Sequence, residues 1–232
     1  MIDLVQVKLE GGVGELILNR PQRRNALIGP LVTELHEGLD TLNANPDCHS
    51  ILLRGAGGYF CAGMDLKEMS ATPPPAWRQS FPDNWAAFHD AVYRTDKPIV
   101  GALEGFAIAG GSALALACDF LIVGKESFFH VAEVERGMFA PINIAWLILR
   151  YGHATAIRLA VQGRRHYGDE LVRMGLAEVC VEEGQVLSSA REFAGRFSGL
   201  ALDAIVRNKR GVRLGRNLDF LALLDNVKDA AK

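Results

Sequence analysis

The sequence predicts an α/β fold in which strands come early and helices dominate the end. Strand-like and helix-like segments alternate over the first two thirds of the chain, which is typical of α/β proteins. From about Ile142 onward, most segments have apolar residues at helical spacing. The chain has 232 residues, of which 49% are hydrophobic, so it is long enough to bury a sizeable core.

The N-terminal segments predict a hairpin, a helix and a further strand. Residues 4–10 and 14–19 have strand-like composition on either side of a glycine-rich turn. Residues 29–45 carry leucines every three or four positions, as an amphipathic helix does. Residues 50–55 form a short apolar run that ends in glycine, which is typical of a buried strand.

The middle of the chain continues the alternation. A Pro-rich loop is expected over residues 70–84, and then a helix through Trp85, Phe88 and Val92 that ends before Lys97-Pro98. Strands are expected over 99–105, 120–124 and 127–131, with a helix over 110–118. No repeat of fixed period is visible, so a solenoid is not expected.

Helices are expected over most of the remaining chain. They cover residues 142–152, 154–163, 168–175 and 184–199, and further amphipathic segments up to Lys232. We therefore expect an α/β core domain over residues 1–141 and a helical C-terminal region over residues 142–232.

Charge and hydropathy argue against two classes of partner. A net charge of -2 and interspersed charges leave no general basic face for nucleic acid. One local cluster, Arg20, Arg23 and Arg24, can meet a small polyanion. The longest apolar run, residues 108–123, is broken by Asp119 and is shorter than the ~20 residues that a membrane span needs.

The cysteines and the N-terminus indicate an intracellular protein. The four cysteines stand singly in apolar surroundings without CxxC spacing, so we expect reduced packing residues and neither disulfides nor a metal site. The first twelve residues alternate in hydropathy and lack the pattern of a signal peptide. We therefore expect a cytoplasmic protein.

In two short stretches, glycine and alanine residues lie next to large apolar residues in the sequence. The first is FCAGMDL, residues 60–66, and the second is GFAIAGGSALALACD, residues 105–119. A backbone N–H can approach an anion only where no side chain blocks it, so a glycine next to a donating residue suits an anion site. Taken alone, the pair Gly110-Gly111 is better explained as a tight turn from a strand into a helix than as an anion site.

Five blocks resemble those of the enoyl-CoA hydratase/isomerase family, the crotonase superfamily, in order and in rough spacing. They are LNRPQRRNAL, FCAGMDLKEM, KPIVGALEGFAIAGGSALALACD, FHVAEVERGM and GLAEVCV, and together they cover nearly the whole chain. The resemblance implies a spiral of ββα units with a helical C-terminal trimerisation region. It also implies an acyl-CoA thioester substrate whose enolate oxyanion is held by two backbone N–H groups, here those of Met64 and Gly110.

The resemblance leaves one acid–base residue where the family's hydratases have two. Ala113 stands at the position of the first glutamate, and Glu133 matches the second. One carboxylate in an apolar cleft can move a proton and contribute about 10²–10⁴-fold to the rate. The alternative for Glu133 is a solvated charge paired with Arg136, and Glu135 points to the opposite side if the segment is extended.

Further substrate contacts follow from the resemblance. Ala62, Asp65 and Leu66 surround the first donor, and Ala113 faces the substrate in place of a glutamate. Arg24 and Lys67 stand where basic residues of the family approach the phosphates of CoA, and Phe139 and Trp146, with Ile142, crowd the acyl pocket. His89 is expected at the pocket lid or the surface, and Asp119 as a structural acid at a helix end.

Three classes of function stay open from the sequence. The leading one is an isomerase or hydratase of acyl-CoA thioesters that uses the two N–H donors and Glu133. The second keeps the donors but hydrolyses or decarboxylates the thioester substrate, and the third is a catalytically weak CoA-binding protein. No cofactor is expected, because coenzyme A enters as part of the substrate. A homotrimer or a dimer of trimers is expected, formed through exposed apolar positions such as Leu218, Leu221 and Leu224.

Overall fold

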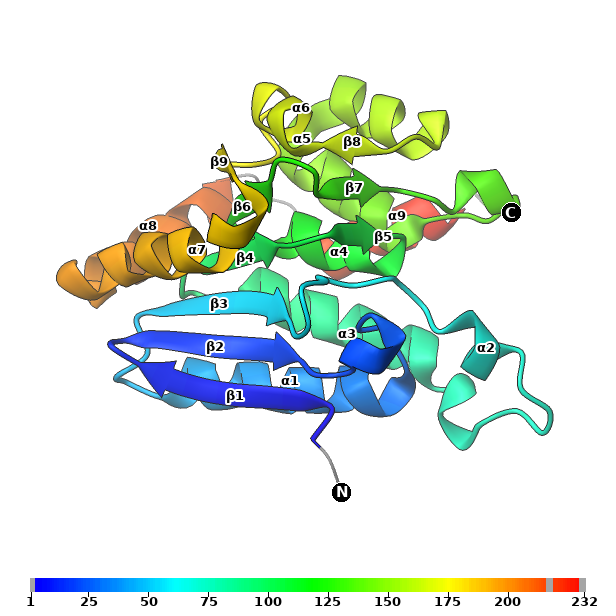
Figure 1. The fold of residues 1–232 in the computed structure, drawn as a ribbon, viewed down its shortest axis with the longest axis horizontal. Helices are drawn as coiled ribbons and strands as arrows, with labels where there is room; N and C mark the ends of the chain where they lie inside the picture. Colours follow the sequence, from blue (N-terminus) through cyan, green and yellow to red (C-terminus); the bar gives the residue numbers. More distant parts are fainter. Residues whose placement is uncertain (1–2, 216–218, 230–232) are drawn as a thin grey trace.

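A computed structural model describes residues 3–215 and 219–229, which form two sheets surrounded by helices (Figure 1). The strands of the main sheet, in spatial order, are β1 (Val5–Glu10), β2 (Val13–Leu18), β3 (Ser50–Gly55), β4 (Ile99–Leu103), β6 (Phe120–Gly124) and β9 (Val179–Val181). β1 pairs antiparallel with β2 as the predicted hairpin, and the other strands run parallel. The strands after the hairpin therefore need helical crossovers between them.

The second sheet is small and lies beside the main one. It consists of β5 (Phe106–Ile108), β7 (Phe128–His130) and β8 (His166–Tyr167). Isolated parallel bridges join Cys61 to Ala107 and Leu27 to Met64. A strand of the main sheet, a short strand or bridge of the second layer and a helix thus recur along the chain, as in β4–β5–α4. This recurrence is the spiral of ββα units that the resemblance implies.

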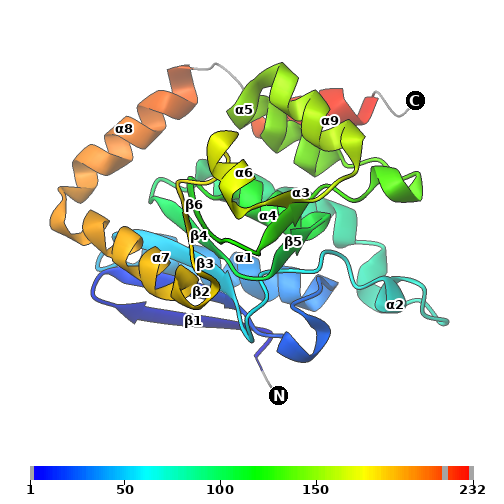
Figure 2. The same ribbon diagram turned by 45° about the horizontal axis from the view of Figure 1, so that its top comes forward.

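The helices are α1 (Gly29–Ala44), α2 (Leu66–Met69), α3 (Phe81–Arg94), α4 (Gly110–Ala117), α5 (Pro141–Gln162), α6 (Gly168–Arg173), α7 (Val186–Gly195), α8 (Leu202–Gly215) and α9 (Phe220–Asp229). Short 3₁₀ turns separate some of them: η1 (Pro21–Arg23), η2 (Ala76–Arg78), η3 (Val134–Arg136), η4 (Glu183–Gln185) and η5 (Arg196–Gly199). Figure 2 shows α7 on one side of the main sheet and α1 on the other. The sheet is therefore covered on both faces.

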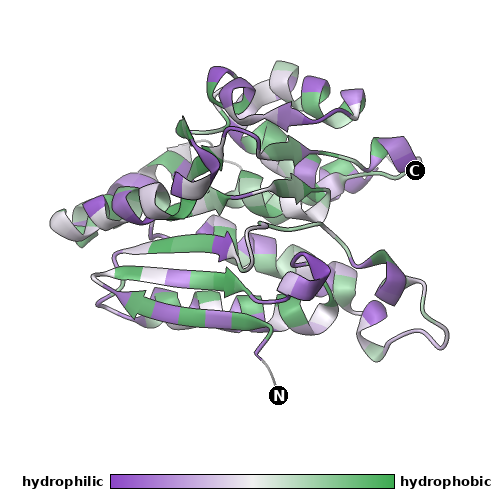
Figure 3. Cartoon of the chain, in the orientation of Figure 1, coloured by the Kyte–Doolittle hydropathy of each residue, from purple (hydrophilic) through white to green (hydrophobic). Residues whose placement is uncertain are grey.

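Alternating strand residues supply the two hydrophobic clusters of the fold. Leu52, Val100 and Ile122 point toward α7 and form the smaller cluster. Their neighbours Leu53 and Ile99 point into the larger cluster, with α1, α3, α4 and α5. Figure 3 shows that apolar residues dominate strands such as β3, whereas the exposed α8 is mixed.

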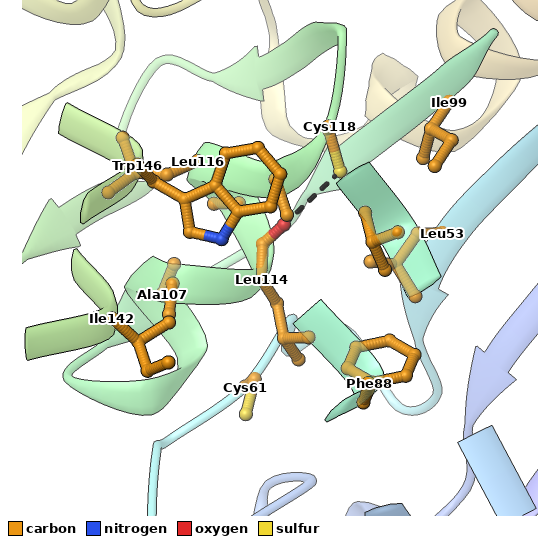
Figure 4. Close-up of a cluster of buried hydrophobic side chains, with 14 of the residues drawn as sticks. Leu53, Cys61, Phe88, Ile99, Ala107, Leu114, Leu116, Cys118, Ile142 and Trp146 are labelled. Carbon is orange, nitrogen blue, oxygen red and sulfur yellow. Dashed lines mark hydrogen bonds between the residues drawn. The ribbon is translucent and has the colours of Figure 1, made fainter. Parts of the chain in front are cut away.

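The centre of the larger cluster lies where α4 meets α3 and α5. Figure 4 shows Leu114 of α4 among Cys61, Phe88 and Trp146, all of which are buried. α9 packs back onto α5 and α3, where the ring of Phe220 lies 4.9 Å from that of Trp146. The C-terminal region therefore completes the core of its own chain.

Most predicted elements are present, and the differences have local causes. β5, β8 and β9 were not expected, because runs of two or three residues carry no periodicity and exist through pairing with distant strands. The two helices expected over 142–163 form one element, α5, which is kinked at Gly152 (φ 75°, ψ 174°). Since β8 and β9 lie in the C-terminal region yet pair with core strands, a domain boundary at residue 141 stays a prediction.

Two expectations about exposed residues are wrong. His89 of α3 is fully buried beside Trp146 and Phe220, so it lies neither at a lid nor at the surface. Burial lowers the pKa of His89 to about 3. Leu224 is 0% exposed because α9 packs on its own chain, whereas Leu221 is 38% exposed; Leu218 lies outside the described residues.

Candidate active site

The two glycine-containing motifs lie against each other although they are far apart in the sequence. Figure 1 shows the segment between β3 and α2 running beside β5 and the start of α4. Gly63 has a positive φ of 80°, and a Cβ there would lie 2.6 Å from the carbonyl oxygen of Ile108 and 3.3 Å from the amide nitrogen of Gly110. A Cβ on Gly111 would lie 2.3 Å from the carbonyl oxygen of Cys61. Both glycines therefore permit a close backbone approach that a side chain would prevent.

The N–H of Met64 is free to donate, because its neighbours make the local hydrogen bonds. In the parallel bridge with Leu27, the amide of Leu27 donates to Gly63 O (2.8 Å) and that of Asp65 donates to Leu27 O (2.9 Å). The N–H of Met64 then faces the other side of the strand. No acceptor for it is found among the residues that the structure describes.

The N–H of Gly110 is also free, at the first turn of α4. Ala109 precedes the helix with φ 50° and ψ -114° and donates its own N–H to His130 O (2.9 Å). The first hydrogen bond of the helix runs from Ala113 N to Ala109 O (3.2 Å), and within the described ranges Gly110 N–H has no acceptor. Free N–H groups and the helix dipole at this end favour negative charge.

Glu133 is a buried carboxyl that follows β7. Glu133 is 8% exposed, and its Oε1 accepts a hydrogen bond from Asn143 Nδ2 (3.0 Å). Oε2 is buried and has no partner among the described residues. Burial raises the pKa of Glu133, against the opposing effects of hydrogen bonds from its own backbone N–H and from Asn143 and of the charge of Arg136. Glu133 makes no ion pair with a described residue, so the alternative of a solvated pair with Arg136 is not supported.

Ala113 lies one turn into α4 and is 0% exposed. The carboxylate that follows it on the chain, Asp119, is used elsewhere: it accepts from Ile99 N and pairs with Arg150 and Lys209. The expectation that Asp119 is a structural acid is thereby confirmed. The described chain offers Glu133 no second acid at the position of Ala113.

Ser112 and His130 lie close to the two motifs but are committed to structure. Ser112 Oγ lies 2.7 Å from His130 O and 3.0 Å from Ala107 O. His130 Nε2 lies 3.0 Å from Gly163 O, and Ser112 Oγ contacts the backbone oxygen of His130 and not its ring. Their contacts do not form the pair of a serine nucleophile and its base.

The residues around Met64 divide into structural and exposed ones. Asp65 is 6% exposed, pairs with Arg20 (3.2 Å) and Arg23 (3.5 Å), and caps α2 by accepting from Glu68 N (3.3 Å). The Asp65 carboxylate thus makes internal contacts, and its contact with substrate stays a prediction. Ala62 donates its N–H to Arg24 O (3.1 Å), and Leu66 is 46% exposed on α2.

Arg24 and Lys67 are both exposed cations beside these segments. Arg24 lies over the ring of Tyr59, with its guanidinium carbon 5.9 Å from the ring centre. Neither side chain pairs with a carboxylate among the described residues. Both charges are therefore available to an anion in solution.

The two predicted pocket residues of the next segment lie in different surroundings. Phe139 is 42% exposed. Trp146 is 1% exposed and donates its indole N–H to His89 Nδ1 (2.8 Å). The structure thus seats Trp146 in the core, where it borders a cavity of about 470 Å³ between α3, α5 and α8. None of the other predicted site residues lines that cavity. Of the charged residues that line it, Asp119 pairs with Arg150 and Lys209, and Arg213 pairs with Asp96 outside the lining.

Sequence reasoning missed Asn143, whose amide contacts Glu133. Its Nδ2 also donates to Ala109 O (3.2 Å), and the residue is 2% exposed. A single amide in the apolar run INIAWLIL was the available signal, because a buried polar side chain must find hydrogen-bond partners. The partners themselves come from β7 and from the start of α4, which the sequence does not bring together.

Comparisons with known proteins agree on one family. A model of the family described as enoyl-CoA hydratase/isomerase matches residues 8–213. An enoyl-CoA hydratase of Mycobacterium tuberculosis is 35% identical over 202 residues, which cover 83% of this chain and 75% of the relative. A peroxisomal Delta(3,5)-Delta(2,4)-dienoyl-CoA isomerase of Arabidopsis thaliana is 29% identical over 241 residues, which cover 95% and 86%.

Solved structures agree on the fold. A protein from Pseudomonas aeruginosa superposes with a TM-score of 0.86 at 29% identity, covering 98% of both chains. An enoyl-CoA hydratase from Bacillus anthracis superposes with a TM-score of 0.85 at 26% identity, covering 97% of this chain and 90% of that one. These neighbours confirm the predicted fold. Within the described ranges, none of the helices combines the length and the apolar character that crossing a membrane requires.

Proposed function

This chain belongs to the enoyl-CoA hydratase/isomerase family, and we propose that it transfers protons on an acyl-CoA thioester with Glu133 as its one acid–base residue. The N–H groups of Met64 and Gly110 hold the enolate oxygen of the thioester. Coenzyme A takes part only as the carrier of the acyl group, and the reaction needs no other cofactor.

The observation that carries this proposal is the state of the Glu133 carboxyl. It is buried, its pKa is raised by burial, and Oε2 has no partner among the described residues. Because its pKa is raised, this carboxyl gains and loses a proton closer to neutral pH than a solvated carboxyl does. Oε2 is then the oxygen that takes and returns a proton.

The missing acid at Ala113 favours isomerisation. Glu133 removes a proton from the α carbon of a β,γ-enoyl thioester, and the electron pair moves through the carbonyl to the thioester oxygen. When the dienolate collapses, the same carboxyl returns the proton to the γ carbon, and the double bond ends between the α and β carbons. One acid–base group completes this cycle, whereas hydration also needs a group that activates and orients water.

The N–H donors supply the charge stabilisation. Negative charge appears on the thioester oxygen in the transition state, and each preorganised donor can lower the barrier by about 2.7–4 kcal/mol. Both N–H groups lie in segments whose glycines keep side chains away. The positive end of α4 adds to the same effect.

Arg24 and Lys67 suit the nucleotide end of the substrate. Both are exposed and free of carboxylate partners in the described part of the chain. Their charges complement the phosphates of CoA. In this arrangement the thioester enters past α2 toward Glu133.

The test compares Glu133→Gln with wild-type protein on 3-butenoyl-CoA. Because the amide keeps the shape of the side chain and the oxyanion donors are backbone groups, the variant should still bind the thioester. Isomerisation to crotonyl-CoA, and deuterium exchange at the α carbon in heavy water, should fall by about 10²-fold or more.

Glu135→Gln is the matched control, because Glu135 is two residues away and its side chain is 53% exposed. Its exchange rate should stay near that of wild type. Exchange that is unchanged by Glu133→Gln would remove Glu133 from the mechanism and favour the hydrolase or the CoA-binding protein. Hydration of crotonyl-CoA by wild type would instead place the chain among the hydratases.

A further inference from the structure

We propose that Asn143 is a positioning residue that orients both Glu133 and the N–H of Gly110 through its two side-chain hydrogen bonds. This inference rests on the proposed function, because it concerns how the acid–base group and one oxyanion donor are held. Asn143 itself does not touch the reacting atoms.

The orientation of the Asn143 amide follows from its partners. Its nitrogen lies 3.0 Å from Glu133 Oε1 and 3.2 Å from Ala109 O. A carbonyl oxygen can only accept, and an ionised carboxylate can only accept, so the NH₂ group must face both of them. Asn143 Oδ1 has no partner among the described residues, which is consistent with its pointing away from both acceptors.

The hydrogen bond to Glu133 decides which oxygen reacts. Asn143 occupies Oε1 and leaves Oε2 to exchange a proton with substrate. It also fixes the carboxyl plane, since Asn143 is 2% exposed and lies in the first turn of α5, just after Pro141. A base held in one orientation reacts more often than one that rotates.

The hydrogen bond to Ala109 O acts on the oxyanion donor. Ala109 C=O and Gly110 N–H belong to the same planar, trans peptide unit, so they point in opposite directions. Holding the carbonyl oxygen therefore aims the N–H of Gly110 to the other side. Ala109 has φ 50°, a conformation that alanine rarely adopts and that persists only where the surroundings enforce it.

The side chain required at this position is narrowly defined. It must offer two N–H donors from one planar nitrogen and carry no charge beside Glu133. It must also be short enough to reach Glu133 and Ala109 O from the first turn of α5. Asparagine meets all three conditions. Leucine offers no donor, and an ionised aspartate offers no donor and repels the Glu133 carboxylate.

The test measures the two halves of the site separately in Asn143→Leu and Asn143→Asp. The probe is butyryl-CoA, which exchanges its α protons but has no double bond to shift. Labelled with ¹³C at the thioester carbonyl, it reports polarisation by the oxyanion donors through its chemical shift. Asn43→Leu is the control, because Asn43 is a partly buried amide of α1 that donates to Thr95 Oγ1 (3.0 Å).

Three results are expected for Asn143→Leu. The exchange rate falls by about 10- to 100-fold, as for a reacting group displaced by about 1 Å. The midpoint of its pH profile moves up, because the lost N–H had stabilised the ionised carboxylate. The downfield ¹³C shift of bound butyryl-CoA shrinks, whereas Glu133→Gln leaves that shift in place. Asn143→Asp should show the same loss of exchange rate and of carbonyl shift. Because aspartate keeps the shape of asparagine, this variant serves as the test if Asn143→Leu does not fold.

The outcomes separate this inference from the proposed function. Suppose that wild type exchanges the α protons of butyryl-CoA and shifts its carbonyl ¹³C signal downfield. If Asn143→Leu then has the same exchange rate and the same ¹³C shift as Asn43→Leu, the inference is wrong and the proposed function stands. A slower rate without a moved pH midpoint or a changed carbonyl shift also overturns it, because it indicates a general structural role. If wild type itself neither exchanges nor polarises the carbonyl, the proposed function fails.

Discussion

Glu133 places a carboxyl in the protein interior without an ion-pair partner among the described residues. Since burial raises its pKa above the ordinary value of 4.5, the folded state binds the proton more tightly than the unfolded state does. The contribution of this group to stability is therefore full at low pH and is lost as the pH rises through the raised pKa. Above the raised pKa the charged carboxyl destabilises the fold relative to a neutral side chain.

We therefore expect Glu133→Gln to be more stable than wild type at pH 7, by about 2–4 °C in Tm for about 1 kcal/mol. The gain should shrink as the pH falls through the raised pKa of Glu133 and should vanish below the ordinary value of 4.5, because the carboxyl is then neutral in both the folded and the unfolded state. Thermal unfolding followed at several pH values between 4 and 8 measures it. A variant that is less stable than wild type at pH 7 would show that the carboxylate is well solvated or paired.

At the scale of elements, the start of α4 meets the segment before α2 so closely that only glycine fits. A Cβ on Gly111 would lie 2.3 Å from Cys61 O, which is a backbone atom and cannot swing away. Gly111→Ala should therefore push α4 from this segment and destabilise the protein by about 1–3 kcal/mol. Gly195→Ala in α7 is the control, because no atom lies within 4 Å of its added Cβ.

The control should be neutral or stabilising by up to about 1 kcal/mol, since alanine restricts the unfolded chain. Urea unfolding measures both variants. The α-proton exchange of Gly111→Ala should also fall, because the Met64 and Gly110 N–H groups move apart. Equal stability and exchange for the two alanine variants would mean that the two segments are not held in contact.

At the scale of the whole molecule, the C-terminal helices leave apolar side chains uncovered. Val212 and Leu214 of α8 are 70% and 74% exposed, and Ile157 and Val161 of α5 are 52% and 61% exposed. Large apolar side chains that are this exposed on two C-terminal helices are candidates for burial against another subunit. We expect light scattering to give three or six times the 25.3 kDa of one chain.

Leu214→Glu should lower that mass, because it places a charge in the covered surface, while circular dichroism stays that of the folded chain. Asp203→Ala is a suitable control, because Asp203 lies on the same helix and its side chain is 73% exposed. A monomeric wild type at micromolar concentration would contradict the expected trimer. An unchanged mass for Leu214→Glu would place the interface elsewhere.

The sequence by itself determined the long elements and the family. The leucine spacing of α1, the alternation of β1 and the glycines of the two motifs are local features, so they can be recognised without a fold. The blocks around Met64, Gly110 and Glu133 appear in family order, and the absence of a carboxylate at Ala113 is legible in the same way.

Only the tertiary structure decided what those residues touch. β5, β8 and β9 exist because distant strands supply their hydrogen bonds, and no local pattern records such pairing. Trp146 belongs to the core because α9 and His89 close over it. Asn143 joins Glu133 to Ala109 because α5 begins beside both. Each contact depends on the packing of elements that are far apart in the chain, and local propensity carries no information about that packing.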